Sequence, residues 1–241
     1  DLNDMSALAE RLDEDPLRAE IALRRSRYAE VTGDFTGMAE AAQQAIQLLP
    51  DDPDNLAMAH FAWGAALLRL ADYVHSREEL ELAVDLAKRA GLTMIQADAL
   101  RSIGSVHLHQ GGYHEGINLL KQAVELYGSI GNLRGQGSCF NNLGGLSYNL
   151  GNYAEALEWM ERAMEVFHQM GDRYGESITT GNIGSVNGMM SDPWKATTYL
   201  ARSIQLSREI GNRMAEVHAM GNLGAILLIL GDDVAVLDVQ E

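Results

Sequence analysis

The sequence predicts an all-α protein, a solenoid of stacked antiparallel helix pairs, because the same residues recur every 40 positions. One series of glycines comprises Gly91, Gly131, Gly171 and Gly211, and a second comprises Gly64, Gly104, Gly144, Gly184 and Gly224. A third series has Gly111, Gly151 and Gly231, with Ser191 in the remaining place, and tyrosines follow at Tyr73, Tyr113 and Tyr153. A period of this length is typical of repeat arrays in which each unit is one pair of elements.

Each unit is predicted to form two helices joined by a tight turn. In the unit 133–172 the first helix runs roughly from Arg134 to Asn149, and the second begins near Tyr153. The second helix carries apolar residues at spacings of three and four, which form one stripe along a helix: Tyr153, Ala156, Leu157, Met160, Ala163, Met164 and Phe167.

The turns carry residues that end one helix and begin the next. We expect Gly151 to adopt the left-handed conformation and Asn152 to cap the following helix. Gly171 and Asp172 repeat this pattern between units. In the next unit, Asp192 is the expected cap, and Pro193 stands at the first helical position, where proline is tolerated.

We therefore interpret residues 1–241 as a single array of about five whole repeats between two partial units. The boundaries are 1–16 (partial), 17–53, 54–92, 93–132, 133–172, 173–212 and 213–241 (partial). The first partial unit looks like a second helix without its partner, and the last ends in a second helix that has barely begun. Solenoids need polar caps at their ends, and neither end supplies an obvious one. We expect the chain to be a fragment of a longer protein.

The glycines within the first helices need a structural reason. An interior glycine costs about 1 kcal/mol relative to alanine, so five would cost about 5 kcal/mol together. Close approach of the second helix would compensate, and its facing residues are also small: Gly116, Ala156 and Ala196. A second row of small residues is predicted to contact the neighbouring unit: Ala45, Ala83, Ala123, Ala163 and Ser203.

Composition excludes several classes of function. The chain has 34 acidic and 18 basic residues, a net charge of -16, which opposes binding to DNA or RNA. The single cysteine, Cys139, forms no internal disulfide, suits a reducing compartment and is expected to pack inside. The longest apolar run, 225–230, is far shorter than the ~20 residues of a membrane span. We expect a cytoplasmic protein that does not contact a membrane.

No arrangement of residues predicts catalysis, a cofactor or a metal site. His107, His109 and His114 are close in sequence, but helical residues two apart point about 200° apart and share no face. His107 is predicted to lie on the packing side. The glycine-rich turns lack the Lys-Ser/Thr pair of a phosphate-binding loop. No nucleophile, base and orienting group come together, so the chain is predicted not to be an enzyme.

The pattern Leu143-Gly144, Tyr153, Ala156 and Ala163 resembles the tetratricopeptide repeat (TPR) family. The 40-residue variant is similar to arrays in spindle-orientation adaptors, kinesin light chains, bacterial signal-transduction ATPases and maltose-regulator-like activators. The resemblance covers nearly the whole chain and is weakest at 17–50, where Arg25-Ser26 replaces Leu-Gly. It implies a right-handed superhelix whose first helices line a concave groove.

Asparagine recurs two residues before the structural glycine, at Asn142, Asn182 and Asn222. The resemblance implies that these amides form a ladder that holds the backbone of an extended peptide. Helices ~10 Å apart and a strand rise of ~3.3 Å per residue would match one asparagine to about every third peptide residue. An amide offers both a donor and an acceptor to a peptide bond. Alternatively, each asparagine bonds only its own or a neighbouring backbone.

Other polar and apolar side chains are expected around this ladder. Arg69 and Arg101, with Arg24 and Arg27, suggest capture of an acidic side chain or a free carboxylate, although ordinary salt bridges are the alternative. Apolar anchors would supply most of the affinity, because a hydrogen bond contributes only about 1 kcal/mol net. The candidate peptide-binding residues are Asn142, Asn182, Asn222, Asn141, Arg101, Tyr148, His109, Ser102, Arg69, Phe61 and Met189.

Two functions fit these observations. The first is a non-catalytic protein–protein interaction scaffold that binds a peptide or protein segment in the concave groove. The second is a ligand- or partner-sensing arm of a multidomain bacterial transcriptional or signalling regulator, in which the partner could be another domain of the same protein. A repeat array specifies its fold far better than its ligand.

Overall fold

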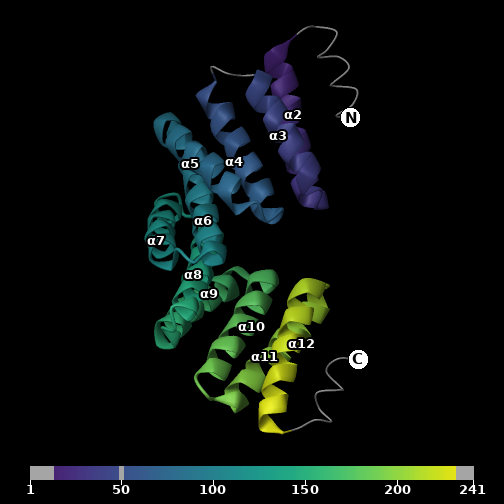
Figure 1. Ribbon diagram of the computed structural model, residues 1–241, viewed down its shortest axis with the longest axis vertical. Coiled ribbons are helices and arrows are strands. Elements are labelled where there is room, and N and C mark those ends of the chain that lie inside the picture. The colour runs from purple at the N-terminus through teal and green to yellow at the C-terminus, as the bar shows by residue number, and fades with distance from the viewer. Residues whose placement is uncertain (1–13, 49–51, 232–241) are drawn as a thin grey trace. The chain divides into compact units, whose positions relative to one another are not determined.

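The computed structural model describes residues 14–48 and 52–231. These residues are all-α, as predicted, and consecutive helices pack as antiparallel pairs (Figure 1). The helices are α2 (Asp15–Thr32), α3 (Phe35–Leu48), α4 (Pro53–Arg69), α5 (Tyr73–Ala90), α6 (Thr93–Gln110), α7 (Tyr113–Ser129), α8 (Leu133–Asn149), α9 (Tyr153–Met170), α10 (Arg173–Met189), α11 (Pro193–Ile210) and α12 (Arg213–Leu230). The partial helices predicted within 1–13 and 232–241 lie outside the described residues.

The helices form two compact units, which divide between Gly131 and Asn132. The first unit contains α2 to α7, and the second contains α8 to α12. In the first unit α4 contacts both α2 and α6, and in the second α10 contacts both α8 and α12. The first helices of successive pairs thus lie side by side and form a wall within each unit. We call these the first wall (α2, α4 and α6) and the second wall (α8, α10 and α12).

Left-handed residues end most of the helices, as the glycine series predicted. Gly91, Gly151 and Gly171 have φ angles of 71°, 79° and 65°. Two residues with side chains take the same conformation, Ala71 at φ 62° and Ser191 at φ 61°. A left-handed conformation costs an L-residue roughly 1–2 kcal/mol. The 40-residue repeat is therefore kept at these two turns at some cost in free energy.

The predicted caps are confirmed at two turns and wrong at a third. Asp172 accepts a hydrogen bond from the backbone N–H of Gly175 at 3.1 Å, and Asp192 accepts one from Lys195 at 3.1 Å. Asn152 occupies the cap position of α9, but its side chain accepts no capping hydrogen bond. The backbone closes that turn instead, because the N–H of Asn152 donates to the carbonyl of Ser147 at 2.9 Å.

The interior glycines allow close nesting of the paired helices, as predicted. A Cβ atom at Gly104 would lie 2.6 Å from Cγ of Leu120, and one at Gly144 would lie 2.6 Å from Cγ of Met160. The small residue that we expected opposite, Ala156, brings its backbone close, since its carbonyl oxygen would be 3.1 Å from a Cβ at Gly144. The space is filled by the large residue one turn further on, so small residues alone do not explain the contact.

The core consists of successive apolar layers between helix pairs. The predicted row of small residues is buried throughout, with exposed fractions of 2% or less at Ala45, Ala83, Ala123, Ala163 and Ser203. Ala83 of α5 packs in one cluster with Ala99 and Ile103 of α6, which belongs to the next pair. The row therefore lies between neighbouring pairs.

Helix α12 is the one described helix that is long and apolar enough to cross a membrane, judged by length and composition alone. Its polar residues nevertheless follow the repeat. Glu216 of α12 accepts a hydrogen bond from Nε of Arg208 on α11 at 2.6 Å, and Asn222 lies on the second wall. The expectation that the chain does not contact a membrane stays a prediction.

Candidate functional site

The second wall contains a pocket of about 200 Å³ between α10 and α12. Two of the three ladder asparagines, Asn182 and Asn222, line it. They occupy equivalent places in successive pairs, so the pocket is built from the repeat itself. The remaining lining residues are Tyr174, Ile178, Gly181, Ser203, Asn212, Met214, Ala215, His218 and Ala219.

The amide nitrogens of this pocket are held by side chains of the preceding first helix. Nδ2 of Asn182 donates to Oδ1 of Asn141 at 3.0 Å, and Oγ1 of Thr179 donates to the same oxygen at 3.3 Å. Nδ2 of Asn222 donates to Oγ of Ser185 at 2.8 Å. The amides thus bond neither their own backbone nor a neighbouring one, which was the alternative to a ligand-facing ladder.

The other end of each amide is available to a ligand. The carbonyl oxygens of Asn182 and Asn222 accept no hydrogen bond from the described residues, while Asn182 is half-buried and Asn222 is exposed. Because the nitrogen is already fixed, the oxygen is held in one orientation. The pocket therefore presents oriented acceptors, which suit a donor such as a peptide N–H.

The remaining candidates on the second wall have less defined roles. Asn142 is half-buried on α8. Tyr148 packs against Tyr153 with ring centroids 5.6 Å apart, and burial raises the pKa of the Tyr148 hydroxyl above its usual range. Met189 is exposed at the end of α10. None of these three residues lines the pocket between α10 and α12.

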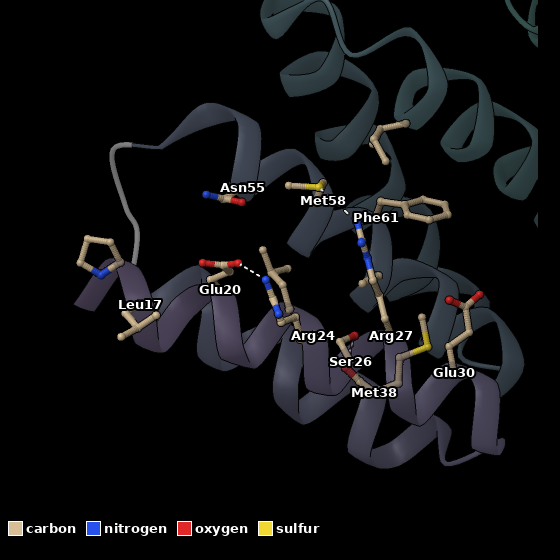
Figure 2. A pocket seen from close by; sticks show the side chains of 14 residues that line it. Leu17, Glu20, Arg24, Ser26, Arg27, Glu30, Met38, Asn55, Met58 and Phe61 are labelled. Atoms are coloured by element: carbon tan, nitrogen blue, oxygen red, sulfur yellow. Dashed lines mark hydrogen bonds and ion pairs between the residues drawn. The ribbon is translucent and has the colours of Figure 1, made fainter. Parts of the chain in front are cut away.

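The first wall contains a larger pocket, with a volume of about 820 Å³ (Figure 2). Phe61, Arg24 and Arg27, which the sequence analysis placed around the ladder, line it together with Met58. The other lining residues are Pro16, Leu17, Glu20, Leu23, Ser26, Glu30, Met38, Asn55, Ala62 and Ile95. Its floor is mainly apolar, and its charged side chains all belong to α2.

Arg101 belongs to a fixed polar cluster on the first wall. Tyr127 of α7 is fully buried, its hydroxyl donates to Oδ1 of Asp98 at 2.5 Å, and Nε of Arg101 donates to the Tyr127 oxygen at 3.3 Å. Burial raises the pKa of Tyr127 far above its usual range. The phenol therefore stays protonated and orients both charged side chains of α6.

Three other predicted residues of the first unit serve mainly the packing of the fold. Ser102 is buried and donates to the carbonyl of Asp98 in its own helix at 2.9 Å. The guanidinium of Arg69 lies over the Phe35 ring, 4.9 Å from its centroid. His109 stacks on Tyr73 with centroids 4.8 Å apart. Arg69 and His109 each join one helix pair to the preceding one.

Sequence reasoning missed the apolar side chains that accompany the asparagines. Tyr174 and Ile178 precede Asn182 by eight and four residues, and Met214 precedes Asn222 by eight. Residues at this spacing share a helix face. Counting back from each asparagine in steps of four would have found these residues, since the amides already marked the relevant face.

The described residues contain no group of three or more His, Cys, Asp or Glu side chains placed to hold a metal ion. His107 is 4% exposed and Cys139 is fully buried, so both lie on the packing side as predicted. The arrangement of the two walls is suited to binding through hydrogen bonds and apolar contacts.

Comparison with solved structures places this fold. The chain is similar to a Rap protein complexed with Competence and Sporulation Factor (TM-score 0.79, 16% identity, covering 99% of this chain and 66% of that one). It is also similar to NprR in complex with its cognate peptide NprX (0.74, 17%, 92% and 65%). A third match is a signal transduction ATPase with numerous domains and a tetratricopeptide repeat sensor from Pyrococcus horikoshii (0.72, 14%, 92% and 35%).

These likenesses establish the fold, and the chain spans less than two thirds of the length of each of the three proteins. No curated protein matches the sequence significantly. The family model described as tetratricopeptide repeat matches residues 95–169 and 136–209. Those residues contain the interior glycines Gly104, Gly144 and Gly184 and the left-handed turns at Gly151 and Gly171. Residues 95–209 belong to the tetratricopeptide repeat family.

Proposed function

We propose that the chain is a non-catalytic interaction scaffold that binds an extended peptide or protein segment along the walls of its first helices. The observation that carries this proposal is the pocket between α10 and α12, where two successive asparagines present oriented carbonyl oxygens. Similarity to NprR, whose solved structure holds a cognate peptide, supports the same function. The acidic composition supports a function without contact to nucleic acid, and the single cysteine suits a cytoplasmic location.

The pocket can fix the register of a bound peptide and contribute to its affinity. A peptide N–H can donate to the carbonyl of Asn182, and another about three residues along can donate to Asn222, given the spacing of packed helices and of an extended chain. Each such bond contributes about 1 kcal/mol. Tyr174, Ile178 and Met214 flank the asparagines, and their apolar surface would provide most of the binding free energy.

Selection from a displayed library of short random peptides tests the proposal with the natural partner still unidentified. A peptide selected on the 241-residue chain is then titrated against wild type and Asn182→Ala/Asn222→Ala by isothermal calorimetry. Loss of two hydrogen bonds should weaken binding by about tenfold or more.

Gln169→Ala is the matched control, because it removes an exposed amide from α9, outside both walls. Equal affinity of the double variant and the control would refute the role of the amides. Failure of the folded chain to select any peptide would refute the function itself.

A second candidate function is a sensing arm, favoured by the likeness to the ATPase with a tetratricopeptide repeat sensor. In that case the walls receive an effector or another domain of the same polypeptide. The affinity of a selected peptide for the full-length protein and for the 241-residue chain distinguishes the two functions. An intramolecular occupant would compete and weaken binding to the full-length protein, whereas a simple scaffold would bind equally in both forms.

A further inference from the structure

We propose that α12 pairs with α12 of a second copy of this chain, so that two chains form an antiparallel dimer with a two-fold axis at Gly221. This inference goes beyond the proposed function, because it assigns an interface between two copies of the chain and not a ligand of the walls. Three observations carry it: an exposed apolar stripe along α12, the symmetry of that stripe and the distribution of charge around it.

The apolar stripe follows one side of α12. It consists of Met214, Val217, Gly221, Ala225 and Leu228, and we call it the α12 stripe. Its three large side chains are 72%, 60% and 58% exposed, although α12 packs against α10 and α11 on its other sides. At about 100° per residue, all five residues lie within about 40° of Gly221 around the helix. Spacings of three and four residues are those along which two helices pack.

The repeat does not account for the exposed valine of this stripe. At the place of Val217 the four preceding first helices carry small, buried residues: Ala57, Ala97, Gly137 and Ser177. In α8 a Cβ atom at Gly137 would lie 3.0 Å from Cε1 of Phe167, on the second helix of the same pair. Valine is larger than all four residues, so α12 does not leave here the space that a second helix uses in other pairs. The stripe therefore suits a different occupant.

The α12 stripe reads similarly in both directions along the helix. Met214 and Leu228 stand seven residues before and after Gly221, and Val217 and Ala225 stand four residues before and after it. In a two-fold interface residue i contacts residue j of the partner, and j contacts i. With Gly221 on the axis of an antiparallel pair, Met214 meets Leu228 of the second copy and Val217 meets Ala225. This symmetry favours a second copy over an unrelated helix.

Gly221 allows the two helices to approach closely at the axis. A Cβ atom there would meet no described atom within 4 Å, so the position is open in the single chain. Packed helices lie roughly 8–10 Å apart depending on the side chains at the contact, and a glycine favours the shorter distance. One stripe on an 18-residue helix buries less area than the roughly 1,200–2,000 Å² of a standard interface. We therefore expect a weak, reversible dimer.

The charges permit this pairing and select its direction. The net charge of -16 opposes association of two copies in general, but the α12 stripe contains no charged residue. The nearby carboxylate of Glu216 is buried and accepts a hydrogen bond from Arg208 at 2.6 Å. Arg213 stands eight residues before Gly221, so an antiparallel pair places its exposed guanidinium at the last turn of the partner helix. The carbonyl end of a helix attracts a cation.

Sedimentation equilibrium of the 241-residue chain over a range of concentrations tests the dimer. Val217→Glu should weaken dimerisation by about tenfold or more, because a carboxylate would be buried against an apolar surface. Val31→Glu is the matched control, since Val31 is 87% exposed on α2 in the other unit. Circular dichroism verifies that each variant folds. A wild type that stays monomeric, or equal dimerisation of the two variants, would overturn the proposal.

A pair of opposite charges tests the antiparallel register. Ala225→Lys alone should also weaken the dimer, whereas Val217→Glu/Ala225→Lys should restore it to within a few-fold of wild type. In the double variant each new carboxylate faces a new ammonium of the second copy, and this occurs twice in the dimer. The two positions are eight residues apart on one helix, so they do not pair within a chain. Failure of the double variant to recover would exclude this register.

Two further measurements separate the dimer from other uses of the stripe. Gly221→Cys places a thiol on the axis and should give a cross-linked dimer on mild oxidation, whereas Gln169→Cys on α9 should not. The native Cys139 is fully buried and does not interfere. Flotation with phosphatidylcholine vesicles tests a lipid surface as the occupant. Vesicle binding that Val217→Glu abolishes, without a dimer in solution, would assign the stripe to lipid and overturn the proposal.

Discussion

The two walls of this protein share a backbone plan but differ in chemistry. The first wall presents arginines over a broad apolar pocket, whereas the second presents amides over a small one. At the ladder position the first wall has Ala62 and Ser102, and the second has Asn142, Asn182 and Asn222. The residues that nest the helices are the same kinds in both units. The repeat therefore fixes how the helices pack, whereas the residues on each wall can differ and suit different ligand groups.

The contacts that join successive pairs also differ between the units. In the first unit they are ring contacts, Phe35 with Arg69 and Tyr73 with His109. In the second unit they are ion pairs, such as Arg134 with Asp172 at 2.8 Å and Arg208 with Glu216 at 2.6 Å. Ion pairs respond to pH and salt more than ring contacts do. The two units should consequently respond differently to solution conditions.

The largest effect should follow from placing a side chain at an interior glycine of a first helix. This change tests whether both units pack their helix pairs in the same way. Gly104→Leu in the first unit and Gly184→Leu in the second each place a side chain where a Cβ alone would lie 2.6 Å and 2.8 Å from a leucine Cγ. Each should lower the free energy of unfolding by about 1–3 kcal/mol, since overpacking forces neighbours to shift. Urea denaturation measures the loss.

Gly221→Ala is the control for these variants, because a Cβ there meets no described atom within 4 Å. It should be neutral or stabilising by up to about 1 kcal/mol. A large loss for only one of the two leucine variants would show that the units nest their helices differently.

A smaller effect is expected from Tyr127→Phe, which tests the fixed cluster of the first wall. Removing the hydroxyl takes one hydrogen bond from Asp98, which keeps its ion pair with Arg101, and should cost about 1 kcal/mol. Because burial raises the pKa of Tyr127, the folded state favours the protonated phenol. Its contribution is complete below the ordinary pKa of 10.0 and is lost as the pH rises toward the folded-state value.

Denaturation of wild type and Tyr127→Phe between neutral pH and about pH 11 measures this contribution. The variant should lose less stability than wild type at alkaline pH. Tyr199→Phe in the second unit is the control, since it removes a hydroxyl from an exposed ring. Parallel pH profiles for wild type and Tyr127→Phe would contradict the assignment.

The smallest effect concerns Glu216, and it tests the ion pairs of the second unit. A hydrogen bond from Arg208, together with the charge of Arg213, lowers the pKa of Glu216 from its ordinary 4.5. The stabilisation is present above that value and is lost as the pH falls through the folded-state pKa. Amides of α12 should therefore exchange hydrogen faster near pH ~4, relative to intrinsic rates, than at neutral pH.

Gln96 occupies the place of Glu216 in the first unit, so amides of α6 provide an internal comparison. Glu216→Gln should make the protection of α12 nearly independent of acid pH. If α6 and α12 lose protection equally on acidification, the ion pairs do not distinguish the units.

The fold could be predicted from the sequence because its determinants are periodic. Gly104, Gly144 and Gly184 indicated where paired helices approach closely, because a side chain there would meet the partner helix. Gly151 and Gly171 indicated the turns, because their backbone is left-handed. The side-chain cap at Asn152 could not be predicted, because backbone hydrogen bonds across the turn satisfy the same groups.

The candidate site was only partly predictable, since its hydrogen bonds join residues about 40 positions apart. The sequence placed Asn182 on the wall but could not show that Asn141 would hold its nitrogen. Ser102 has the same register, yet its short side chain reaches only the carbonyl four residues back. The role of Tyr127 could not be predicted, because the equivalent positions of the other repeats hold Ala87, Phe167 and Ser207, which share no chemistry.

In each unit, every described helix touches only helices that are next or next but one along the chain. These contacts close no long loop, so the chain loses little entropy to loop closure when it folds. One helical hairpin can therefore form after another. A bound segment that spans several first helices would connect hairpins that are otherwise coupled only through their neighbours. Occupancy would then make the stack unfold more cooperatively.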